Sequence, residues 1–77
     1  MEDNPNFKAV VGNIDHFLAD MKREGHSITS IVETRFGMPL QTFRRRQNDP
    51  GTYHLYELDH IARFMGTDVL TLMGSKQ

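Results

Sequence analysis

The residues best suited to chemistry gather in one short segment, Arg35 to Gln47, which carries four arginines and no acidic residue. Arginine neutralises phosphates and donates paired hydrogen bonds to guanine, and the glutamine amide can pair in the same way with adenine. Gln41 stands three residues before the run Arg44-Arg45-Arg46, so both kinds of donor fall close together. These side chains favour contact with nucleic acid, and a solvated charged surface is the simpler alternative.

Charge is unevenly distributed along the rest of the chain. The formal net charge of the 77 residues is −1, and residues 1–34 hold six acidic residues against three basic ones. One basic segment in an acidic body gives a polarised electric field, which can attract phosphates although the net charge is near zero.

Other chemistries have weaker support. The histidines His16, His26, His54 and His60 include no pair at i,i+4, and the chain has no cysteine, whereas zinc requires three or four clustered ligands. Glu57 and His60 could act in acid–base catalysis, but they are also ordinary neighbours three apart on a helix. We expect no enzyme, no metal and no cofactor.

The length and the termini bound the class of protein. Seventy-seven residues form one domain with a modest core. No apolar run approaches the roughly 18 residues of a membrane span, and the polar start Met1 to Asn6 is unlike a signal peptide. We expect a soluble cytoplasmic protein, nucleoid-associated when bound to DNA, with no membrane partner and no small-molecule substrate.

Helical periodicity predicts the elements that position the basic segment. The first helix is expected from about Pro5, with one apolar stripe that ends before Gly25. The stripe contains Phe7, Val10, Val11, Ile14, Phe17, Leu18 and Met21. The second helix is expected from Ser27 to Phe36, and its predicted inner face contains Ile28, Ile31, Val32 and Phe36.

The third helix is expected from Pro39 to Gln47, with Phe43 as its main buried side chain. A fourth helix is predicted from His54 to Met65, and a short last turn from Val69 to Met73, capped by Asp68. The whole chain, 1–77, then forms a single domain with frayed ends at residues 1–4 and 74–77. The fold class is therefore all-α, compact and five-helical.

The second and third helices meet at Phe36-Gly37-Met38-Pro39. So short a connection forces a sharp angle between them, as in a helix-turn-helix. The polar face of the third helix would then project outward, where its side chains could reach base edges in the DNA major groove.

Two stretches, Ile31–Arg45 and Leu55–Leu72, resemble the lambda-repressor and Cro-like (XRE-type) helix-turn-helix family. The resemblance implies a sequence-specific DNA-binding transcriptional regulator, expected to be a repressor, with double-stranded DNA as its partner. Gly37 matches the family's turn glycine, and Pro39 falls at the usual capping position. The residues that fall at DNA-contacting positions are Leu40, Gln41 and Arg45 for bases, Thr42 and Arg44 beside them, and Asn48 for the backbone.

The sequence also departs from the family pattern. Glu33 stands where a small residue is usual, four before the turn glycine. A second helix one residue longer would place Ile31-Val32 at the usual pair and shift the register. Arg46 falls where an apolar residue is common, and if it meets DNA we expect it to contact phosphate.

Two alternatives stay open at this point. Phe7, Val10 and Val11 extend the first apolar stripe beyond the family's core, so they could be ordinary core or part of a homodimer contact. The same fold could also serve as a protein-interaction module, such as an anti-repressor or an antitoxin-like adaptor.

Overall fold

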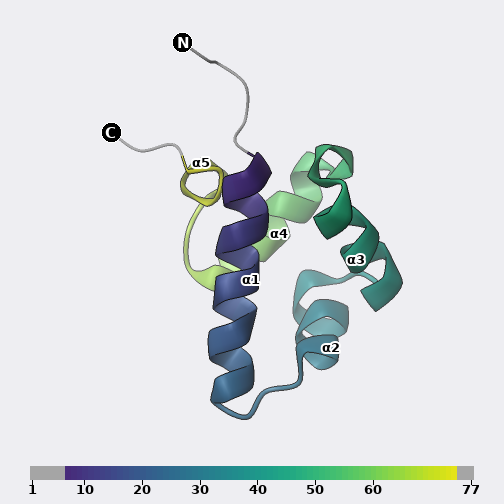
Figure 1. The fold of residues 1–77 in the computed structure, drawn as a ribbon, viewed down its shortest axis with the longest axis vertical. Helices are drawn as coiled ribbons and strands as arrows, with labels where there is room; N and C mark the ends of the chain where they lie inside the picture. Colours follow the sequence, from purple (N-terminus) through teal and green to yellow (C-terminus); the bar gives the residue numbers. More distant parts are fainter. Residues whose placement is uncertain (1–6, 75–77) are drawn as a thin grey trace.

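The computed structural model describes residues 7–74, and within that range it contains helices and turns but no β-strand. The α-helices are α1 (Phe7–Arg23), α2 (Ile28–Ser30), α3 (Leu40–Asn48), α4 (Leu55–Met65) and α5 (Val69–Leu72). The π-helix η1 (Ile31–Phe36) continues α2, and the 3-10 helix η2 (Pro50–Thr52) follows α3. Figure 1 shows α1 along the long axis, with α2 and α3 to one side and α5 to the other. The expected compact, five-helix, all-α architecture is confirmed.

The helix ends differ from the predicted ones by about one residue. The predicted start of the first helix at Pro5 lies outside the described residues. Pro39 is extended (φ −62°, ψ 147°) and precedes α3, which continues to Asn48. Gly74, expected to be frayed, belongs to the ordered turn after α5, where its N–H donates to the Thr71 carbonyl at 2.9 Å.

The predicted second helix begins as expected, because the Ser27 hydroxyl accepts the Ser30 N–H at 3.2 Å. From Ile31 onward, however, it is a π-helix, whose hydrogen bonds span five residues instead of four. The Gly37 N–H accordingly donates to the Val32 carbonyl. Within η1 the Thr34 hydroxyl donates to the carbonyl of Ser30, the residue before the π-helix, at 2.6 Å, and a side chain that bonds into the backbone ladder in this way disturbs its regular pattern.

The buried face of the π-helix includes Ile31, Val32 and Phe36, whereas Arg35 is exposed. On a regular α-helix counted from Ile28, positions i+7 and i+8, which are Arg35 and Phe36, would both lie on the apolar face. The wider turn therefore leaves Arg35 outside the core while Phe36 stays within it.

The turn after η1 depends on glycine. Gly37 has φ +76° and ψ 30°, the left-handed region that favours a residue without a Cβ. Met38 follows as a buried side chain, and its N–H donates to the Val32 carbonyl at 3.2 Å. Three residues thus separate η1 from α3 and fix a sharp change in direction.

A row of aromatic rings links the helices inside the molecule. The Phe43 ring of α3 lies 5.7 Å from Phe36, Phe36 lies 6.0 Å from Phe64 of α4, and Phe64 lies 5.7 Å from Phe17 of α1. The buried hydrophobic residues are Val10, Ile14, Leu18, Ile31, Val32, Phe36, Met38, Phe43, Tyr53, Leu58, Ile61, Ala62 and Leu72. The anchor of α3 is therefore part of a core to which all the main helices contribute.

The first apolar stripe belongs partly to this core. Val10 is fully buried within the chain, so its assignment to a homodimer surface is wrong. Phe7 and Val11 are half-buried, and Phe7 packs against the core.

Over residues 7–74, no helix is long and apolar enough to cross a membrane.

Candidate nucleic-acid interface

Helix α3 has an inner face that holds it in place and an outer face that projects away from the molecule. Phe43 provides the apolar contact of the inner face, with 5% of its surface exposed. One aromatic residue is a small anchor for a helix of nine residues. Two polar side chains of the inner face, Arg46 and Gln47, add specific contacts to other helices.

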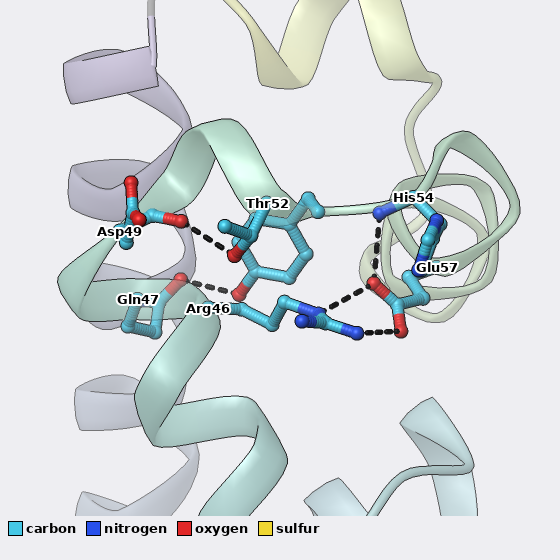
Figure 2. A network of polar contacts seen from close by, with 7 residues as sticks. Arg46, Gln47, Asp49, Thr52, His54 and Glu57 are labelled. Atoms are coloured by element: carbon cyan, nitrogen blue, oxygen red, sulfur yellow. Dashed lines mark hydrogen bonds and ion pairs between the residues drawn. The ribbon is translucent and has the colours of Figure 1, made fainter.

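Arg46 ties α3 to the beginning of α4 through Glu57 (Figure 2). Its Nε donates to Glu57 Oε1 at 3.0 Å, and its Nη2 donates to Oε2 at 3.3 Å. The two side chains are only 16% and 7% exposed. This two-point pair places Arg46 against Glu57 inside the fold and not among the exposed side chains of α3, so the predicted phosphate contact would require the pair to open.

Glu57 is ionised in this setting and also orders the start of α4. Its Oε1 accepts the backbone N–H of His54 at 2.8 Å. Burial by itself would raise the pKa of the Glu57 carboxyl, but the hydrogen bonds from Arg46 and from the His54 amide outweigh burial and hold the pKa below its usual value. One carboxylate thus accepts hydrogen bonds from a half-buried guanidinium and from a helix-terminal amide.

Gln47 makes the second polar contact of the inner face. Its Nε2 donates to Asp15 Oδ1 of α1 at 3.0 Å, and its Oε1 accepts the Tyr53 hydroxyl. Burial, followed by the charges of Glu57 and Asp15, raises the pKa of Tyr53 far above its ordinary value, so the phenol stays protonated and donates. Tyr53 is therefore a packing residue with a satisfied hydroxyl.

The outer face carries four exposed side chains, Gln41, Arg44, Arg45 and Asn48. Their spacing of three, one and three residues places them on one stripe of the helix. Within residues 7–74, Arg44 and Arg45 have neither an ion pair nor a side-chain hydrogen bond. Two adjacent cations and two amides are therefore free to contact a partner.

Two other predicted contact residues lie at the edges of this stripe. Leu40 and Thr42 are half-buried, and Leu40 packs against the core. Pro39 gives α3 no side-chain cap, so the first amides of the helix remain for solvent or for an anion. The predicted residues thus fall into an exposed group, a half-buried pair and the internal Arg46.

Arg35 belongs to a different part of the surface. Its guanidinium carbon lies 5.7 Å from the centroid of the Phe64 ring on α4, a cation–π distance. The four arginines of the basic segment therefore separate into two on the outer stripe of α3, one in an internal ion pair and one over an aromatic ring.

From the sequence, Glu57 is a candidate for acid–base catalysis and an ordinary helix neighbour of His60, and its specific contact with Arg46 is not predicted. A signal was present, because Arg46 stood at a position where an apolar residue is common. An arginine drawn into the interior needs a carboxylate partner. Glu57 lies in the first turn of α4, where a negative charge also suits the helix dipole.

Nothing in the described part of the chain gathers three or more His, Cys, Asp or Glu side chains in a way that could hold a metal ion. Comparisons with protein-family models, with curated proteins and with solved structures gave no match. The interpretation of the site therefore depends on its own geometry and chemistry.

Proposed function

We propose that this chain is a sequence-specific DNA-binding regulator that inserts α3 into the major groove. The observation that carries the proposal is the outer stripe of α3, where Gln41, Arg44, Arg45 and Asn48 are exposed. A helix fixed on one side by Phe43, Arg46 and Gln47 can present these side chains in a constant geometry. An α-helix also matches the width of the major groove.

The side chains of the stripe suit two kinds of contact. Gln41 and Arg45 are one helical turn apart, so their ends can reach neighbouring base pairs. An amide pairs with adenine and a guanidinium with guanine, and each good two-point contact gives about 1–3 kcal/mol of discrimination. Arg44, Asn48 and the uncapped amides at the start of α3 suit phosphate oxygens.

A selection from random double-stranded oligonucleotides with the purified full chain tests the proposal. We expect an enriched motif, and a palindromic motif would indicate two copies on one site. Arg45→Ala should relax the motif at one position while the protein stays folded. Arg63→Ala is the matched control, because Arg63 is an exposed arginine that Asp59 pairs at 2.9 Å. The absence of any motif, or a motif unchanged in Arg45→Ala, would contradict the proposal.

A protein-interaction module is the second candidate. The observation that favours it is the Arg46–Glu57 pair, which removes one of the cations that a DNA surface would use. Retention on double-stranded DNA and on heparin at low salt separates the two candidates. A chain that neither DNA nor heparin retains would contradict the DNA-binding proposal and leave the protein-interaction module as the remaining candidate.

A further inference from the structure

A groove beside α3 has a composition different from that of the outer stripe. It lies between α1, α2 and α3 and holds about 460 Å³, a volume typical of ligand clefts. Its apolar lining includes Leu18 and Ala19 from α1, Ile28 from α2, and Leu40 and Phe43 from α3. Ile28 and Leu40 are half-buried, so apolar surface remains open to a partner.

The charges at the groove are unequal. Lys22 of α1 and Arg44 of α3 both line it, and both are exposed without an ion pair among residues 7–74. Asp15, the acidic residue of the lining, accepts the hydrogen bond from the neutral Gln47 amide and forms no ion pair among these residues, so two cations of the groove face one carboxylate. An apolar groove flanked by two unpaired cations is complementary to an apolar partner that carries carboxylates.

The larger groove between α1 and α5, of about 850 Å³, has no such selectivity. Its Asp20 pairs with Arg23, and its Asp68 accepts the Thr71 N–H at 2.8 Å. Leu70 is exposed there, but among the described residues no cation without an ion pair lines this groove beside it, and the two carboxylates already hold contacts within the chain.

We propose that the groove between α1 and α3 binds an acidic amphipathic helix of another protein. Apolar side chains at i and i+3 or i+4 of that helix would pack on Ile28 and Leu40. Glutamates or aspartates on its flanks would pair with Lys22 and Arg44. This is the helix-in-groove mode of recognition, in which apolar anchors supply affinity and charges supply orientation.

Such a partner would regulate DNA binding, a consequence that rests on the proposed function. Arg44 belongs both to the groove and to the outer stripe, so one guanidinium cannot serve phosphate and a peptide carboxylate at the same time. The acidic helix would therefore compete with DNA.

The test is a selection on the full chain, without DNA, from a library of helical peptides. Every peptide has leucine at each third or fourth position, and its flanking positions vary between Glu and Lys. We expect enrichment of Glu on the flanks. Selected peptides should lose at least tenfold in affinity for Lys22→Glu and for Ala19→Trp, which fills the groove. Lys8→Glu, another exposed lysine of α1, should leave affinity unchanged, and circular dichroism should show that all three variants are folded.

Several outcomes would overturn the proposal. The first is a selection without preference for Glu over Lys, and the second is a set of peptides that bind Lys22→Glu and Ala19→Trp unchanged. Self-association of the free chain that Ala19→Trp abolishes would assign the groove to a second copy. A tenfold loss of DNA affinity in Ala19→Trp without peptide would assign it to nucleic acid.

The two proposals fail separately. Peptide binding without DNA binding would support the groove proposal and contradict the DNA-binding proposal. DNA binding without selective peptide binding would support the DNA-binding proposal and contradict the groove proposal. If both occur, the selected peptide should displace DNA from the wild type, and Lys22→Glu should resist displacement while binding DNA.

Discussion

Arg45 and Arg46 are neighbours in the sequence and have opposite roles in the structure. Arg45 is exposed and has no ion-pair partner within residues 7–74, whereas the Arg46 side chain is 16% exposed and holds Glu57 at two points. Consecutive residues of a helix point about 100° apart, so identical side chains meet different surroundings. A run of like charges in the sequence is therefore not one functional unit in the structure.

The inner face of α3 holds the helix in place, and the outer face is exposed for binding. The inner face combines one aromatic contact with two polar contacts to α1 and α4, so it fixes the orientation of α3 as well as its position. The side chains of the outer face are therefore not needed to hold α3 in place. Substitutions on the inner face should therefore change stability, and substitutions on the outer face should change binding.

The largest expected effect is on the inner face at Phe43. Phe43→Ala removes a buried ring next to Phe36 and should lower the free energy of unfolding by about 3–5 kcal/mol, because it leaves a cavity. Gln41→Ala, on the exposed stripe, should change it by less than about 0.5 kcal/mol. Urea denaturation followed by circular dichroism measures both values. Equal effects would remove the distinction between the two faces.

The next effect concerns the ion pair. Glu57→Gln leaves the half-buried guanidinium of Arg46 without its carboxylate, and we expect a loss of about 2 kcal/mol in unfolding free energy. Arg45→Ala should cost less than about 0.5 kcal/mol because Arg45 is exposed. The double variant Arg46→Met with Glu57→Leu should recover much of the loss. A Glu57→Gln protein as stable as the wild type would show that the pair does not anchor α3.

Much of the fold could be predicted from the sequence, because apolar spacing and turn residues act locally. The stripe of α1, the glycine turn at Gly37 and the anchor Phe43 all appear in the structure at the expected places. The exposed stripe of α3 also agrees with its sequence pattern. These features depend on residues within one or two turns of each other.

The parts that escaped prediction depend on contacts between distant residues or on backbone geometry. The Arg46–Glu57 pair joins residues eleven apart on two helices, and the order of the residues alone does not show which carboxylate turns inward. The π-helix was visible only as a register shift, since Ile28, Ile31, Val32 and Phe36 are also compatible with an α-helix. The hydrogen bond from the Gly37 N–H to the Val32 carbonyl and the exposed position of Arg35 distinguish the two.

A smaller effect should appear in the salt dependence of DNA binding. Each phosphate neutralised contributes roughly −0.9 to the slope of log affinity against log salt concentration. Arg44 is the arginine of α3 assigned to phosphate, so it should contribute about −0.9 to the slope per protomer. Arg44→Ala should make the slope shallower by about 0.9, whereas Arg45→Ala, which removes a base contact, and Arg46→Met should leave it nearly unchanged. An equal change in all three variants would mean that Arg45 also meets phosphate and that Arg46 leaves Glu57 to do so.

The smallest effect is the contribution of Glu57 to the dependence of stability on pH. The pKa of Glu57 in the folded chain lies below its ordinary value of 4.5, because the hydrogen bonds from Arg46 and His54 outweigh burial. A depressed pKa means that the unfolded chain binds the proton more readily, so the carboxylate stabilises the fold above pH 4.5 and loses that contribution as the pH falls through the folded pKa. The difference in unfolding free energy between the wild type and Glu57→Gln should therefore be constant near neutral pH and shrink below about pH 4.5.

This comparison isolates Glu57 from the other acidic residues whose pKa is lowered. The pKa of Asp20 is lowered by its hydrogen bond with Arg23, and the pKa of Asp68 by the Thr71 amide. Both carboxylates therefore also stabilise the fold less in acid, but to the same extent in the wild type and in Glu57→Gln. Arg46→Met provides the second arm, because Glu57 then lacks its guanidinium and the pKa should rise. The gap between wild type and Arg46→Met should therefore also narrow in acid. Gaps that stay constant down to the acid unfolding transition would show that the pair is not ionised, and the fixed orientation of α3 would then need another cause.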